Sequence, residues 1–152
     1  MQIVTFKPNY SQAFYDLNME WLETFFYVEA YDREVLSNPM KYIIEPGGHI
    51  FFAIEDDIVL GTVALLKRSE TSFELTKMAV RPDARGKQIG QKLLQYCIDF
   101  AHDNDFECLF LYSHRKLENA IYIYKKYGFV EIHLEQPNPY ERSNIKMEYP
   151  LS

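Results

Sequence analysis

Cysteine, glycine and basic residues are all scarce in this sequence of 152 residues. It has two cysteines and six glycines, and its 16 lysines and arginines are outnumbered by 22 acidic residues, which gives a net charge of −6. A nucleic-acid partner would require a broad basic face, so we expect none. No hydrophobic run approaches the length of a membrane span, and the N-terminus lacks the layout of a signal peptide. We therefore expect a cytoplasmic protein that does not bind a membrane.

Hydrophobic and aromatic side chains, by contrast, are abundant, at 47% and 16% of the residues. This composition is typical of a folded domain and not of a disordered chain. We predict a single domain over residues 1-152, with Cys97 and Cys108 as structural thiols rather than a disulfide. The four histidines show no metal-ligand spacing with the cysteines or with carboxylates, so no metal is expected.

The most informative stretch runs from Phe73 to Tyr96 and has the sequence FELTKMAVRPDARGKQIGQKLLQY. Its first part, Phe73 to Val80, is rich in residues that suit a β-strand, and Pro82 is expected to end that strand. From Gln88 onward, apolar residues recur at the spacing of one helix face. The pattern predicts a strand, a basic turn with glycines, and a long helix.

The turn between this strand and this helix, Arg85–Gly90, has the features of an anion-binding site. The first N–H groups of a helix have no partner within the helix, and the helix dipole adds partial positive charge there. Gly86 and Gly90 let a ligand approach the backbone, and Arg85 and Lys87 add mobile charge. We predict that this turn binds a pyrophosphate.

Two segments resemble a known family when they are taken together. Arg85-x-x-x-x-Gly90, after a strand that ends near Val80, resembles motif A of the GNAT superfamily of N-acetyltransferases, whose pattern is Gln/Arg-x-x-Gly-x-Gly/Ala. The segment AIYIYKKYGF, from Ala120 to Phe129, resembles the family's Ala-x-x-Leu-Tyr-x-x-x-Gly-Phe segment. The two occur in the family's usual order. The resemblance covers most of the chain.

The resemblance implies a mixed α/β fold with a mostly antiparallel central sheet of about seven strands, splayed at the cofactor cleft and covered by helices on both faces. The patterns predict the order β-α-α-β-β-β-α-β-α-β-β. A first helix is expected over Gln12–Phe26 with Ser11 as its cap, and a short helix over Asp32–Ser37 with Asp32 as its cap. Pro39–Gly48 is expected to be a loop.

The resemblance also implies that acetyl-CoA is the co-substrate. The backbone of the central strand would pair with the pantetheine arm, and the N–H groups of the turn would hold the pyrophosphate. The residues expected to bind acetyl-CoA are Met78, Ala79, Val80, Arg85, Gly86, Lys87, Gln88, Ile89, Gly90 and Tyr124. Gln88 stands where the family usually has glycine, and binding should survive because the site needs the N–H of this residue.

Tyr124 matches the family tyrosine that stands near the CoA sulfur and is often assigned as the acid for the leaving thiolate. It also lies on the apolar face of its helix, so core packing is the alternative. Leu117 stands where many family members have an asparagine that contacts the cofactor. Ser113 and His114, at the end of the preceding strand, could supply that polar contact.

Glu74 is the leading candidate for the general base, because it lies in the strand that would flank the cleft. The alternative is a carboxylate at a strand edge or in a salt bridge. Glu29 is a second candidate for the base. Tyr27, Tyr140 and Arg142 could join Glu29 on the acceptor side, where Arg142 could bind a substrate carboxylate.

These features predict an acetyl-CoA-dependent N-acetyltransferase that acts on a primary amine, by direct attack in a ternary complex. The aromatic residues around the expected acceptor side favour a small-molecule acceptor over a protein amine. A non-catalytic CoA-binding or sensor domain is the alternative from another class, and the departures at Gln88 and Leu117 motivate it. The last strands and the exposed hairpin could pair in a homodimer.

Overall fold

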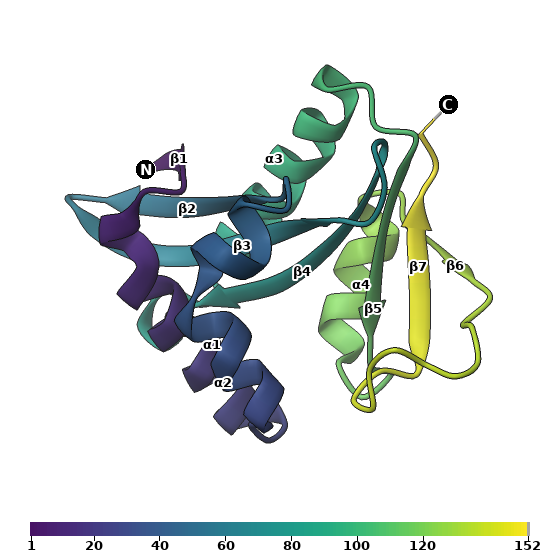
Figure 1. Ribbon diagram of the computed structural model, residues 1–152, viewed down its shortest axis with the longest axis horizontal. Helices are drawn as coiled ribbons and strands as arrows, with labels where there is room; N and C mark the ends of the chain where they lie inside the picture. The colour runs from purple at the N-terminus through teal and green to yellow at the C-terminus, as the bar shows by residue number, and fades with distance from the viewer. Residues whose placement is uncertain (152) are drawn as a thin grey trace.

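A computed structural model describes residues 1–151 and contains one seven-stranded sheet with helices on both of its faces (Figure 1). The strands are β1 (Gln2–Thr5), β2 (His49–Glu55), β3 (Ile58–Lys67), β4 (Ser72–Val80), β5 (Cys108–Ser113), β6 (Val130–Ile132) and β7 (Ile145–Tyr149). The α-helices are α1 (Ser11–Phe25), α2 (Ala30–Ser37), α3 (Ile89–Asp103) and α4 (Glu118–Lys126). This order of strands and α-helices confirms the predicted one. None of the helices in residues 1–151 is long and apolar enough to cross a membrane.

The sheet opens between its two central strands. Its strand order is β1-β2-β3-β4-β5-β7-β6, and all neighbours are antiparallel except β4 and β5. These two pair only over Ser72–Glu74 and Cys108–Phe110, and beyond this point they diverge (Figure 1). The predicted splay of a mostly antiparallel sheet is therefore confirmed.

A β-bulge in β4 accompanies this divergence. Thr76 pairs with Ala64 of β3 and Ala79 pairs with Thr62, so Lys77 and Met78 together lie opposite the single residue between them in β3. Lys77 has a φ of 55°. A bulge increases the local twist and bends the strand that contains it. It is consistent with β4 turning away from β5.

The core has two layers, one on each face of the sheet. Phe51 and Phe52 are neighbours in β2, and side chains alternate between the two faces along a strand. Phe51 belongs to the core cluster that contains Leu93 of α3, whereas Phe52 belongs to the cluster that contains Phe14 of α1. Helices α3 and α4 thus cover one face, and α1 and α2 cover the other.

Two predicted helix caps are wrong. Ser11 is the first residue of α1 rather than its cap, because a short 3-10 helix, η1 (Pro8–Tyr10), leads directly into α1. Helix α2 is capped by Glu29, and Asp32 lies one turn later. The Asp32 carboxylate accepts the backbone N–H of Glu29 at 2.9 Å, while the Glu29 side chain accepts the N–H of Asp32. This capping box uses both acidic residues, so the sequence signal for a cap was assigned to the wrong partner.

The predicted loop Pro39–Gly48 contains a π-helix, η2 (Met40–Ile44), which is a correction to the sequence-based expectation. At the edges of the sheet lie β1 and β6, whereas the β2–β3 hairpin is paired on both sides. The β2–β3 hairpin, which the homodimer prediction names, therefore has no free strand edge with which to pair. The predicted homodimer stays a prediction, with β6 as the edge that the last strands leave open.

Gly48 is expected to be essential for stability, because its position has no room for a side chain. A Cβ atom there would lie 2.6 Å from the carbonyl oxygen of Leu65 and 2.7 Å from that of Ile43. We expect Gly48→Ala to lower the free energy of unfolding by about 3 kcal/mol, and Tm by roughly 6–12 °C in thermal denaturation.

Gly90→Ala is the matched control. A Cβ atom there would lie 3.7 Å from the sulfur of Met78, which is an ordinary contact distance. Because alanine is the better helix former, Gly90→Ala should stabilise the protein by about 0.5–1 kcal/mol. Equal effects of the two substitutions would contradict this explanation.

Candidate active site

A cleft of about 530 Å³ lies where β4 and β5 diverge, and side chains from α1, α2, β4, β5, α4 and residues 139–143 line it. The predicted site residues in its lining are Glu29, Glu74, Met78, Ala79, Val80, Arg85, Tyr124, Tyr140 and Arg142. Ser113, His114 and Leu117 also line it. Tyr27 does not, although its hydroxyl donates to the lining residue Glu141 at 3.4 Å. Residues 86–90 lie outside the lining.

The turn before α3 presents unpaired backbone donors. Within residues 1–151 the first N–H bonded in the helical pattern is that of Lys92, which donates to the carbonyl of Gln88 at 3.0 Å. The N–H groups of residues 86–91 have no backbone acceptor in this part of the chain, and no side chain caps the helix. A Cβ atom added to Gly86 would meet no atom within 4 Å. The turn is therefore open to an anion, as its sequence predicts.

Gln88 adopts a backbone conformation that favours glycine. Its φ of 63° and ψ of 22° are left-handed, a conformation that glycine adopts without steric cost. The side chain of Gln88 is exposed. A glycine at this position would adopt the observed backbone conformation without strain.

Gln88→Gly is expected to raise the free energy of unfolding by about 0.5–1 kcal/mol, because it relieves the left-handed strain at some cost in unfolded-state entropy. The dissociation constant for CoA should stay within about threefold, since the N–H remains. Urea denaturation and calorimetry measure the two quantities. A loss of stability would contradict the left-handed conformation of this residue.

Arg85 is held by the protein itself and is not mobile, which corrects the sequence-based expectation. Its guanidinium donates to Glu20 of α1 at 2.6 Å and to the carbonyl of Val80 at 3.2 Å. It also lies over the ring of Phe25, 5.5 Å from the centroid. Arg85 thus connects the turn to α1, and the charge of Lys87 remains exposed.

Tyr124 lines the cleft from α4, and its hydroxyl makes no hydrogen bond within residues 1–151. Its ring packs against Phe129 at a centroid distance of 5.9 Å. Burial raises the pKa of Tyr124 to about 12, so the phenol stays protonated at neutral pH. The side chain packs on the core, as the alternative predicted, and it also lines the cleft, whereas its role as the acid stays a prediction.

Glu74 is a buried, fully engaged carboxylate with 1% of its surface exposed. One oxygen accepts two bonds from Arg68, at 3.0 Å from Nε and 2.5 Å from Nη2. The other oxygen accepts the hydroxyl of Tyr140 at 2.7 Å. Burial and the nearby charge of Glu74 raise the pKa of Tyr140. The arrangement matches the salt-bridged alternative, and it connects Glu74 to the cleft through the Tyr140 hydroxyl.

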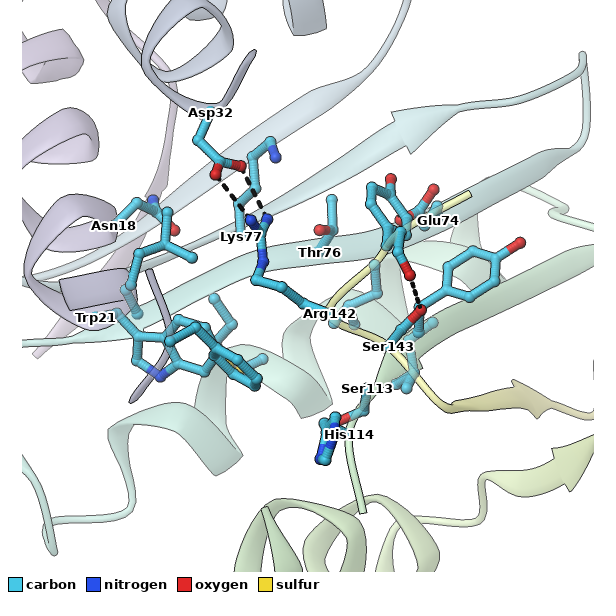
Figure 2. A pocket seen from close by; sticks show the side chains of 18 of the residues that line it. Asn18, Trp21, Asp32, Glu74, Thr76, Lys77, Ser113, His114, Arg142 and Ser143 are labelled. Atoms are coloured by element: carbon cyan, nitrogen blue, oxygen red, sulfur yellow. Dashed lines mark hydrogen bonds and ion pairs between the residues drawn. The ribbon is translucent and has the colours of Figure 1, made fainter. Parts of the chain in front are cut away.

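Arg142 crosses the cleft to Asp32, as Figure 2 shows. Its two terminal nitrogens donate to the two Asp32 oxygens at 2.8 Å each, and Glu29 lies 3.7 Å away. Burial raises the pKa of Asp32, but the hydrogen bonds from Arg142 and from the N–H of Glu29 outweigh it, so that the pKa is lowered. The terminal nitrogens expected to bind a substrate carboxylate therefore bind the protein's own Asp32.

Three residues that line the cleft, Arg68, Asp32 and Lys77, were not expected there from the sequence. Lys77 follows Thr76 in the predicted central strand, so its position could have been flagged from the sequence. Arg68 and Asp32 gave no such signal, because their roles depend on partners distant in the chain. In residues 1–151 no three histidine, cysteine, aspartate or glutamate side chains are grouped so that they could hold a metal ion.

Comparisons with known proteins agree with this geometry. A sequence model of the Acetyltransferase (GNAT) family matches residues 11–129. An uncharacterized N-acetyltransferase of Dictyostelium discoideum is 23% identical over 181 aligned residues, which cover 80% of this chain and 84% of the relative. The crystal structure of a GNAT-family acetyltransferase from Staphylococcus aureus Mu50 matches with a TM-score of 0.87 at 23% identity, over 99% of each chain. An aminoglycoside 6'-N-acetyltransferase solved in complex with coenzyme A matches with a TM-score of 0.73 at 18% identity, over 97% of this chain and 96% of that one.

The open sheet and its cleft thus define an acyltransferase with the GNAT fold. The chain belongs to the Acetyltransferase (GNAT) family, whose members use acetyl-CoA, and the predicted family and enzyme class are confirmed.

Proposed function

We propose that this enzyme transfers the acetyl group of acetyl-CoA to the primary amine of a small molecule, by direct attack in a ternary complex. The observation that carries the proposal is the row of unpaired N–H groups at residues 86–91, close to the open side of β4. The crystal structure of the aminoglycoside acetyltransferase with coenzyme A supports the choice of cofactor.

The residues present fit coenzyme A at two places. The N–H groups of residues 86–91 would hold the pyrophosphate, and the exposed glycine at position 86 leaves space for it. Met78–Val80 have no strand on the β5 side, so their backbone can pair with the extended pantetheine arm. The bound acetyl-CoA supplies an acetyl thioester.

Two tyrosines are proposed to handle the protons of the reaction. The amine loses its proton to the Tyr140 oxygen as Tyr140 passes its own proton to Glu74, to which it is already hydrogen-bonded at 2.7 Å. A nitrogen–carbon bond then forms as the carbon–sulfur bond breaks. Tyr124, which lines the cleft and makes no hydrogen bond within residues 1–151, donates its hydroxyl proton to the leaving sulfur. The second proton then leaves the new amide nitrogen and returns to Tyr124 through solvent.

The walls of the cleft favour a small acceptor. Five aromatic side chains line the cleft, and they come from α1, from the residue that follows it, from the π-helix, from β5 and from the segment before β7. They are Trp21, Phe26, Tyr42, Tyr112 and Tyr140. An enclosure of this kind suits a small molecule better than the extended chain of a protein substrate.

The test mixes the purified protein with acetyl-CoA and a panel of small amines and peptides, and follows the release of free thiol. We expect turnover with small amines and little with peptides. Turnover with peptides alone would identify a protein-amine acetyltransferase. Tight CoA binding in calorimetry without transfer to any amine would instead support the sensor alternative and refute the proposed function.

A further inference from the structure

Lys77 differs from every other cationic side chain that lines the cleft. Arg68 is paired with Glu74, Arg85 with Glu20 and Arg142 with Asp32. The Lys77 ammonium has no carboxylate within 4.0 Å and makes no hydrogen bond within residues 1–151. The side chain is partly buried, and it lies near Asp32 in Figure 2.

An unpaired ammonium in a partly buried position is unfavourable, because the cation loses hydration without gaining a partner. Burial lowers the pKa of Lys77, and the charges of Glu74 and Asp32 oppose this shift only in part. Each of these two carboxylates is already bound by an arginine, Arg68 or Arg142, whose positive charge also acts on Lys77. Neither of these two carboxylates is therefore free to pair with Lys77.

The backbone supports a functional reason for this placement. Lys77 lies at the β4 bulge with a φ of 55°, a strained conformation for a residue with a side chain. It directly precedes Met78–Val80, the segment proposed to hold the thioester arm. A group bound by Lys77 would therefore lie in the same cleft as the proposed thioester arm.

We propose that the acceptor is a small amine that also carries a carboxylate a few bonds away, as a free amino acid does, and that Lys77 binds this carboxylate. The inference rests on the proposed transferase function and names the substrate class of the same site. The terminal nitrogens of Arg142 cannot take this part while they bind Asp32. A polyamine, in contrast, would bring a second cation toward Lys77 and be repelled.

The test compares amino acids with their own carboxamides, such as glycine with glycinamide and phenylalanine with phenylalaninamide. Each pair differs in the negative charge and little in size. Because a charge-assisted hydrogen bond is worth about 1.5–3 kcal/mol, we expect kcat/KM to be about 10- to 100-fold higher for the preferred amino acid than for its amide. Lys77→Met should remove this difference, and Lys77→Arg should retain most of it.

Lys7→Met is the control, since Lys7 is exposed between β1 and η1 and does not line the cleft. It should leave the preference unchanged. Equal use of acids and amides by the wild-type enzyme would overturn the inference, as would a preference that persists in Lys77→Met. If Lys77→Arg and Lys77→Met both lose activity toward acids and amides alike, Lys77 acts in the reaction itself and the inference also fails.

A binding measurement separates this inference from the proposed function. Calorimetry of the CoA-saturated protein with each acid and amide does not depend on turnover. Preferential binding of an acid that is lost in Lys77→Met would support the inference even if no acetyl group were transferred, whereas the proposed function would then fail. No preferential binding of any acid in the panel, with CoA bound normally, would overturn the inference alone.

Discussion

Replacing Tyr124 with phenylalanine is expected to lower kcat by about 100-fold or more, because the leaving sulfur loses its proton donor. The dissociation constant for CoA should change by less than about threefold, since the phenylalanine ring keeps the contact with Phe129. Little stability should be lost, because the Tyr124 hydroxyl has no hydrogen bond to the protein within residues 1–151. Steady-state kinetics and CoA calorimetry measure the two effects.

Tyr122→Phe is the matched control, because Tyr122 lies on the same helix with 66% of its surface exposed. It should leave kcat unchanged. The pKa of about 12 for Tyr124 adds a second check, since this group stays protonated in the range of most assays. The pH profile of the wild-type enzyme should therefore show no loss of activity from Tyr124 ionisation below about pH 10. Full activity in Tyr124→Phe would remove this residue from the reaction.

Glu74→Gln is expected to lower kcat by about 100-fold at pH 7, because it removes the final proton acceptor behind Tyr140. The loss should shrink as the pH rises above the pKa of the acceptor amine, which then arrives without its extra proton. Tyr140→Phe should show the same recovery, since it interrupts the same path at the hydroxyl that bonds Glu74 at 2.7 Å. Kinetics from pH 6 to pH 10 would follow both variants.

The pH dependence separates proton transfer from a structural role of Glu74. The carboxylate is buried and paired with Arg68, so Glu74→Gln also affects stability. Thermal denaturation of the same samples measures that effect separately. A loss of kcat that is equal at every pH would show that Glu74 only holds Arg68 and Tyr140 in place.

Local patterns were enough to predict the order of the strands and helices and the open turn before α3. The strand that ends at Val80, the glycine-containing turn and the helix from Ile89 are contiguous in sequence, and each carries its own signal of propensity or periodicity. The order of strands and α-helices follows from the same local signals. The family motif adds the expectation of a splayed sheet, which the short pairing between β4 and β5 confirms.

The side-chain network of the cleft could not be predicted in this way. The Arg142–Asp32 pair joins residues 110 positions apart, and the Glu74–Tyr140 bond joins residues 66 positions apart. Such pairs depend on how the segment before β7 folds back over the sheet, which no local pattern describes. The bulge that places Lys77 likewise depends on its register with β3.

The most direct test is a crystal structure of the protein with coenzyme A bound. We predict that the pyrophosphate oxygens accept hydrogen bonds from the N–H groups of residues 86–91, that the pantetheine arm pairs with Met78–Val80, and that the sulfur lies within hydrogen-bonding reach of the Tyr124 hydroxyl. Coenzyme A bound elsewhere on the protein, or a sulfur remote from Tyr124, would contradict the proposed site.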